Sequence, residues 1–133
     1  MFSTDVNFLA VLVAGIAYFM IGGLWYSVLF GKAWLAAIGK TEEEVRNEGG
    51  APVAYVVSFI GSLISAYFLA VFMNGTTLQA GLGMGFFVWL GFVATTNASP
   101  YFYENRNKRL YLIYGAYTLV SFLVMGAILA LWQ

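Results

Sequence analysis

Four long runs without a charged residue divide the chain, and short polar segments separate them. The runs cover residues 6–29, 52–72, 78–94 and 110–132, and every Lys and Arg lies between them. Because an α-helix rises about 1.5 Å per residue, runs of this length cross, or nearly cross, a hydrocarbon core of roughly 30 Å. The pattern predicts one all-α integral membrane domain over residues 1–133, a bundle of four transmembrane helices at about 6–30, 52–73, 77–99 and 109–132.

Composition narrows the chemistry that this domain can perform. Hydrophobic residues make up 62% of the chain and charged residues only 9%, which is too apolar for a soluble domain. The net charge is zero, and no basic run resembles a nucleic-acid surface. The chain has no Cys and no His, which removes thiol chemistry, imidazole bases and the usual zinc ligands. We therefore expect membrane lipids as the surroundings, with no cofactor, no metal and no nucleic-acid partner.

The basic residues are distributed unevenly among the connections between the four runs. All six lie in the first and third connections: Lys32, Lys40, Arg46, Arg106, Lys108 and Arg109. Positive charge is retained on the cytoplasmic side of membrane proteins. The first and third loops are therefore predicted to be cytoplasmic, both termini are predicted to face outward, and a mixture of two orientations is not expected.

The connections themselves carry turn and cap signals. The second connection, residues 73–77, reads Met-Asn-Gly-Thr-Thr and predicts a tight hairpin that makes the second and third helices antiparallel neighbours. In the first connection, Thr41 followed three residues later by Glu44 matches a capping box. It predicts a short amphipathic helix in the cytoplasmic loop, ended by Gly49 and Gly50.

The two halves of the chain share a loose pattern. In the first and third runs, a Gly-rich stretch leads into a Ser or Thr, so that Gly22 aligns with Gly91 and Ser27 with Thr96. A parallel repeat of two helices each is one explanation, and the chance similarity of Gly-rich membrane helices is the other.

Small residues recur at helical spacing on the second and third runs. We refer to them as the small-residue seam: Ser58, Ser62, Ala66, Gly81 and Gly85. Lipid supplies no hydrophobic drive for helix association, so helices pack in it by close backbone approach at such residues. The seam could pack the helices of one protomer or join subunits. There is more small-residue surface than four helices need, which predicts a homo-oligomer.

Aromatic residues gather near the predicted membrane surfaces. Trp25, Tyr26 and Trp34 fall near the cytoplasmic surface and Trp132 near the outer one, as in the aromatic belts of many membrane proteins. A ligand cage that includes Trp25, Tyr26 and Trp89 is the alternative.

The spans contain no Asp, Glu, Lys or Arg, which argues against an ion-coupled transporter. Polar residues concentrate at the inner end of the third run, before and after Pro100. One interpretation is that they satisfy a helix end, with Glu104 paired to a nearby cation. The other is a polar vestibule at the cytoplasmic side, formed by Ser27, Thr95, Thr96, Asn97, Glu104 and Arg106.

Several segments together resemble a known family. They are residues 23–27, 30–34, 39–44, 102–106, 116–117 and 125–129, and they are similar to the bacterial membrane family called domain of unknown function 1761 (DUF1761). The resemblance implies four helices in a bacterial inner membrane and no established activity. It points to recurring positions at Trp25, Tyr26, Ser27, Trp34, Glu104 and Arg106. Val28 stands where the family often has Pro, and Tyr114 where it often has Asn.

These observations lead to a functional expectation. No acid, base and nucleophile can be assembled from the residues present, so an enzyme is not expected. We expect a homo-oligomeric structural or accessory protein of the membrane. The alternative is a passive channel or carrier for a small solute or ion, lined by hydroxyls and backbone carbonyls.

Overall fold

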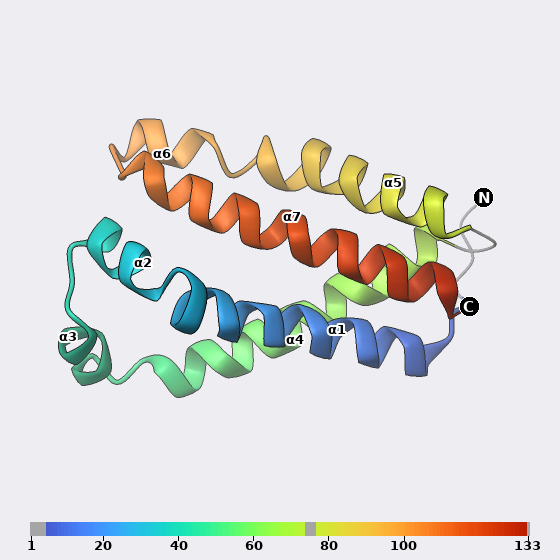
Figure 1. The fold of residues 1–133 in the computed structure, drawn as a ribbon, viewed down its shortest axis with the longest axis horizontal. Helices are drawn as coiled ribbons and strands as arrows, with labels where there is room; N and C mark the ends of the chain where they lie inside the picture. The colour runs from blue at the N-terminus through green and yellow to red at the C-terminus, as the bar shows by residue number, and fades with distance from the viewer. Residues whose placement is uncertain (1–4, 74–76, 133) are drawn as a thin grey trace.

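The computed structural model describes residues 5–73 and 77–132, and every element in that part of the chain is a helix (Figure 1). In order these are α1 (Phe8–Leu24), η1 (Trp25–Leu29), α2 (Gly31–Ile38), α3 (Glu42–Asn47), α4 (Ala51–Phe72), α5 (Leu78–Val88), η2 (Trp89–Ala94), α6 (Ser99–Tyr103) and α7 (Lys108–Leu131). Four stretches are long and apolar enough to cross a membrane: Phe8–Leu29, Pro52–Phe72, Leu78–Tyr103 and Lys108–Leu131. The prediction of an all-helical chain with four such spans is confirmed.

Polar residues at the ends of the spans explain where the helices begin. The side-chain oxygen of Asn7 accepts hydrogen bonds from the first backbone N–H groups of α1, and Asn107 does the same for α7. Thr77 caps α5 through the N–H of Ala80, at 3.3 Å. Pro52 occupies the first turn of α4, where its missing N–H leaves no bond unmade. The first, third and fourth spans therefore begin at a side chain that satisfies N–H groups which lipid could not satisfy, and Pro52 lowers by one the number of such groups at the start of the second.

Two spans are interrupted by π-helical turns, which the sequence pattern did not indicate. In the first span, η1 follows α1 directly, and the N–H of Phe30 donates to the carbonyl of Trp25, five residues earlier, at 2.8 Å. In the third span, η2 follows α5. Each π turn adds a residue, so the side chains beyond it are rotated by about 100° relative to a continuous α-helix. A helix face predicted from regular α-helical spacing is therefore wrong for the residues of both spans that follow the π turn.

Helix α7 lies at the centre of the molecule (Figure 1). Helix α5 packs along one side of it, α1 packs along another, and α4 crosses behind α1. The hairpin expected at residues 73–77 includes residues 74–76, which lie outside the described residues. Helices α4 and α5 run in opposite directions (Figure 1) but make few close contacts along their lengths, so the expectation that the second and third spans are packed neighbours is wrong. Instead, α4 packs against α1, and α5 packs against α7.

Glycines bring α5 and α7 into close backbone contact. A Cβ atom on Gly85 would lie 2.5 Å from the carbonyl oxygen of Phe122, and one on Gly81 would lie 2.8 Å from that of Gly126. Such distances leave no room for any side chain. Helices α1 and α4 meet in a similar way, because a Cβ on Gly15 would lie 3.2 Å from the Cα of Leu63.

The small-residue seam is therefore used mostly inside the protomer. Gly81 and Gly85 are buried against α7, while Ser62 and Ala66 are buried in α4. The hydroxyl of Ser62 donates to the carbonyl of Ser58 at 2.8 Å, but Ser58 itself is exposed.

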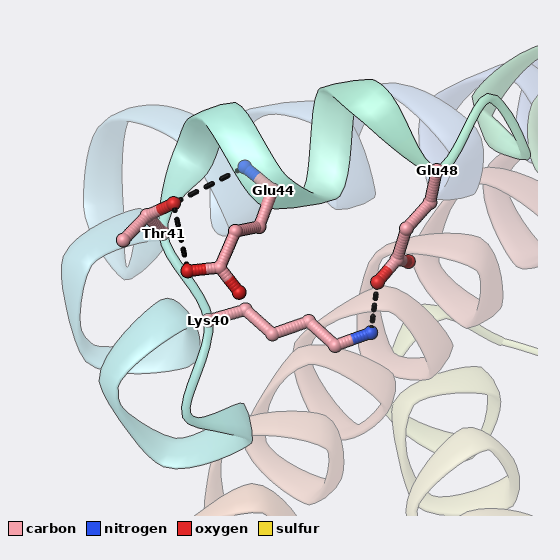
Figure 2. Close-up of polar contacts among 4 residues, drawn as sticks. All are labelled: Lys40, Thr41, Glu44 and Glu48. Carbon is pink, nitrogen blue, oxygen red and sulfur yellow. Dashed lines mark hydrogen bonds and ion pairs between the residues drawn. The ribbon is translucent and has the colours of Figure 1, made fainter.

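All the charged residues except Asp5 gather at one end of the molecule, where α2, α3, α6 and the start of α7 lie (Figure 1). The short helix expected after Thr41 is present as α3 (Figure 2). Thr41 accepts the N–H of Glu44 at 3.1 Å and donates its own hydroxyl to the Glu44 carboxylate, and Lys40 pairs with Glu48 at the end of the helix. At the opposite end, the Asn7 amide donates to the carbonyl of Trp132 at 3.5 Å, which joins the start of α1 to the end of α7.

Candidate functional site

The hydroxyls proposed for a polar vestibule turn back onto their own helices. Ser27, Thr95 and Thr96 each donate to a backbone carbonyl four residues earlier, at 2.7 Å in the case of Thr95. All three side chains are exposed, as is Asn97. Each hydroxyl donates a hydrogen bond to a backbone carbonyl within or shortly before a π turn. The structure places Ser27 on η1 and the other residues beyond η2, so they are not gathered around one another by the fold of a single protomer.

Glu104 and Arg106 form an ion pair in the loop between α6 and α7. One nitrogen of Arg106 lies 3.0 and 3.1 Å from the two carboxylate oxygens of Glu104, and its guanidinium carbon lies 5.7 Å from the centre of the Tyr101 ring. The hydrogen bond and the negative charge of Glu104 raise the pKa of the Arg106 guanidinium. Both side chains are exposed, so the interpretation of Glu104 as the partner of a nearby cation is confirmed, with Arg106 as that cation.

The structure brings together a different group of residues on the N-terminal half of α7. Three tryptophans from other elements donate their indole N–H groups to a stretch of six residues of this helix, Ile113–Thr118. The bonds are Trp25 to the Ile113 carbonyl (3.1 Å), Trp34 to the Tyr114 hydroxyl (3.0 Å) and Trp89 to the Thr118 hydroxyl (2.9 Å). An indole N–H buried among apolar groups costs free energy unless it finds an acceptor, and α7 supplies all three acceptors.

Six aromatic side chains pack around the bonds of Trp25 and Trp34, and we call them the α7 aromatic cluster: Tyr18, Trp25, Tyr26, Trp34, Tyr114 and Tyr117. Tyr26 is at its centre, with its ring 5.4 to 5.7 Å from the ring centres of Trp34, Tyr114 and Tyr117. Aromatic pairs at such distances contribute roughly 0.5–1.5 kcal/mol each beyond their burial. The cluster therefore fixes α1, η1 and α2 to α7.

Tyr114 has a specific part in this arrangement. Its hydroxyl accepts the indole N–H of Trp34, which lies on α2, and the amide of Asn107 donates to the carbonyl of Ala37 on the same helix at 3.4 Å. These two bonds dock α2 against the start of α7. The family resemblance gave Tyr114 only as a departure from Asn, and the structure shows that the departure supplies a polar partner for Trp34.

The second π turn is bonded to α7 in a related way. Trp89 begins η2 and donates to Thr118, while Tyr111 donates its hydroxyl to the carbonyl of Ala94, the last residue of η2, at 2.6 Å. Both π turns begin with a Trp, Trp25 in η1 and Trp89 in η2, that is bonded to α7. The sequence carried no spacing signal for these bonds, because Trp25 and Trp89 lie far along the chain from their acceptors Ile113 and Thr118.

The positions of the tryptophans bear on the two aromatic interpretations. Trp25, Tyr26 and Trp34 direct their rings into the protein against α7, where they are half-buried. Trp89 reaches α7 from the α5 side, so it does not complete a cage with Trp25 and Tyr26. Trp132 lies at the other end of the molecule, beside a small cavity of about 50 Å³ that Asp5 and Asn7 also line.

Among residues 5–73 and 77–132, no group of three or more carboxylate, Cys or His side chains is placed to hold a metal ion. No curated protein and no solved structure matches the chain. A model of one family does match, the family described as "Protein of unknown function (DUF1761)", and it covers residues 9–130, nearly the whole length. The resemblance seen in the sequence is therefore correct, and the chain belongs to the DUF1761 family of proteins of unknown function.

Proposed function

We propose that this protein is a homo-oligomeric structural or accessory protein of the membrane, without enzymatic activity. The observation that carries the proposal is the use of polar groups within the spans. The indole N–H groups of Trp25, Trp34 and Trp89 are bonded to α7, and the Ser and Thr hydroxyls named above are bonded to carbonyls of their own helices. Polar groups committed to internal bonds hold a structure together, whereas a transport path needs groups that can exchange partners with a solute.

Oligomerisation is supported by the first half of α4. Its residues from Pro52 to Ser58 are exposed, and a Cβ added to Gly61 would meet no other atom within 4 Å. Ala54, Ser58 and Gly61 lie on one face of the helix, so a second helix could approach them closely. Gly81 and Gly85 of α5 are already packed against α7, whereas this face of α4 is open to a second subunit.

Cross-linking in native-like bilayers tests the oligomer. Because the chain has no Cys, Ser58→Cys gives a single reactive thiol on the exposed face of α4. We expect disulfide-linked dimers from Ser58→Cys and none from Ala116→Cys, which is exposed on α7 away from that face. A wild-type protein that remains monomeric at high protein-to-lipid ratio would contradict the proposal.

One observation favours the alternative of a passive channel. Thr95, Thr96 and Asn97 are exposed beyond the π turn of the third span, and π turns occur often at functional sites. An oligomer could enclose these side chains along a shared axis. Flux through reconstituted vesicles distinguishes the two functions: vesicles that remain tight to small ions and neutral solutes favour the accessory protein. Flux that is lost in Thr96→Leu without loss of assembly favours the channel.

We further propose that the charged end of the molecule faces the cytoplasm of a bacterial cell, with both termini on the outer side of the inner membrane. The support is that all six Lys and Arg lie in the first and third loops. Membrane-impermeant thiol reagents applied from outside should label Gly75→Cys in the second loop and should not label Glu43→Cys in the first. Labelling of both positions in intact cells would show a mixed orientation.

A further inference from the structure

Positive charge is shared unevenly between the two charged loops of the molecule. In the first loop, residues 30–51, three cations are set against four carboxylates. In the third loop, residues 104–109, three cations are set against the single carboxylate of Glu104. The first loop is therefore slightly acidic, and the surplus of positive charge lies between the end of α6 and the first turn of α7 (Figure 1).

Ion pairs separate the cations of this end of the molecule further. Three of the six are paired: Lys40 with Glu48, Arg46 with Glu42 and Arg106 with Glu104. Lys108 and Arg109 are exposed, and neither makes an ion pair within the part of the chain that the structure describes. Lys32 has no ion pair there either, but it lies apart from them on α2, in the acidic loop. Two neighbouring charges on α7 are thus left for a partner from outside the chain.

An exposed apolar face begins one helical turn after these two charges. Leu112 follows Lys108 by four residues and Arg109 by three, so the three side chains are neighbours on the surface of α7. Leu112 is 67% exposed, and Ala116 and Val120 continue the exposed face along the helix. Because Lys108–Leu131 is long and apolar enough to cross a membrane, this face lies against lipid and the two cations lie at the membrane surface.

Aromatic rings stand beside the same two charges. Phe102 and Tyr103, the last residues of α6, are 72% and 90% exposed. The Nζ atom of Lys108 lies 5.0 Å from the centre of the Phe102 ring, within the range of a cation–π contact. Exposed aromatic rings next to Lys and Arg are typical of protein surfaces at the level of lipid headgroups.

One kind of molecule matches every part of this surface, namely a phospholipid with a net negative charge. Its phosphate would meet Lys108 and Arg109, and its acyl chain would lie along Leu112. A free phosphate ion would use the charges and leave the apolar face without a partner. A zwitterionic phospholipid would use the apolar face but would bring a positive group of its own toward the two cations. We propose that Lys108 and Arg109 bind the headgroup of an anionic phospholipid such as phosphatidylglycerol.

Native mass spectrometry of the full chain tests the proposal. The protein is reconstituted in vesicles that contain equal amounts of phosphatidylglycerol and phosphatidylcholine with the same acyl chains, and it is then extracted in mild detergent. We expect the wild type to retain several-fold more phosphatidylglycerol than phosphatidylcholine. The double substitution of Lys108→Gln with Arg109→Gln should bring this ratio close to one, because it removes both partners of the phosphate.

The first loop supplies a matched control. Lys40→Gln combined with Arg46→Gln removes one Lys and one Arg from the same end of the molecule, but both of these cations are already paired with carboxylates. This variant should keep the ratio of the wild type. An equal fall in the two double variants would show that only the overall charge matters, and it would overturn the proposal. So would a wild-type protein that does not prefer phosphatidylglycerol.

Measurements on the wild type cover the case in which the loss of two charges prevents correct insertion. Salt screens exposed charges, so a higher salt concentration during extraction should lower the retained phosphatidylglycerol several-fold and leave phosphatidylcholine unchanged. Retention that salt does not alter would contradict the proposal. Displacement of the lipid by soluble glycerol phosphate, at matched ionic strength, would indicate a site for a free phosphate and would also overturn it. None of these outcomes depends on subunit contact, so the proposed homo-oligomer fails separately.

Discussion

The two halves of α7 are held to their neighbours in opposite ways. Its C-terminal half meets α5 through backbone contact, with Gly126 against Gly81 and Phe122 against Gly85. Its N-terminal half meets η1, α2 and η2 through large aromatic rings and three indole hydrogen bonds. The C-terminal half depends on glycines, which have no side chain. The N-terminal half depends on Trp and Tyr, which have the largest side chains.

This difference arises because lipid provides no hydrophobic driving force for helix association. Water is not present to drive apolar surfaces together, so helices associate through dispersion contacts or through polar groups. Glycines allow the first by close approach, but only where the helices are regular. Near η1 and η2 the backbone departs from the α-helix, and rings with polar edges can fill the wider and less regular space.

The largest effect is expected from adding a side chain where α5 meets the C-terminal half of α7. Gly85→Leu would place atoms against the Phe122 carbonyl, which is backbone and cannot move aside, and it should cost at least about 3 kcal/mol or prevent folding. Gly83→Leu is the control, because a Cβ there would meet nothing within 4 Å. Yield of monodisperse protein and unfolding in a denaturing detergent measure both. Equal behaviour of the two variants would show that the glycine contact is not essential.

A smaller loss of stability is expected from removing an aromatic ring from the N-terminal half of α7. Tyr117 contacts Tyr18, Trp25 and Tyr26, and Tyr117→Ala should destabilise the protein by about 2 kcal/mol through lost packing. Tyr117→Phe keeps the ring and loses only a 3.4 Å hydrogen bond to the Tyr18 carbonyl, so it should remain near wild type. If Tyr117→Phe is as damaging as Tyr117→Ala, the hydroxyl and not the ring stabilises the cluster.

Removing one indole donor should cost less again. Trp34→Phe loses the bond to Tyr114 and should lower stability by about 1 kcal/mol, as for other hydrogen bonds between membrane helices. The effect should be local, with faster hydrogen exchange in α2 and little change in α5. Trp132→Phe, at the opposite end of the molecule, is the control. Uniformly faster exchange along the chain would mean that α2 docking supports the whole fold.

The smallest effect is expected outside both halves of α7. Glu104→Gln removes the partner of Arg106 in an exposed loop, where ion pairs contribute little, and expression and thermal unfolding should remain nearly unchanged. A folded Glu104→Gln protein that loses a cellular activity would instead identify Glu104 as part of a functional vestibule.

Much of the fold could be read from the sequence because lipid imposes simple rules. Long uncharged runs must be helices, since backbone groups in hydrocarbon need internal partners. The Thr residues of the second connection predicted a cap for the third span, which Thr77 supplies, and Thr41 predicted α3. Asn7 and Asn107 cap α1 and α7 without having been singled out in the sequence. These signals are local, and they require no knowledge of which helices touch.

The partner of each helix depended on the tertiary structure. The short second connection predicted contact between α4 and α5, but Gly81 and Gly85 of α5 fit α7 and Gly15 of α1 fits α4. Glycine spacing shows that a helix can be approached closely and does not show by what. The aromatic residues posed the same difficulty, because a Trp near a membrane surface can equally face lipid or an acceptor on another helix.

The sequence by itself determined that the chain forms four apolar helices, where they begin, and that charge collects in the first and third loops. The tertiary structure decided that α7 is the central helix and that Trp25, Trp34 and Trp89 donate hydrogen bonds to it. It also decided that η1 and η2 rotate the side chains that follow them in the first and third spans. The physical reason is that burial in lipid is a property of each segment, whereas close packing and hydrogen bonding between spans depend on pairs of surfaces that only the folded chain brings together.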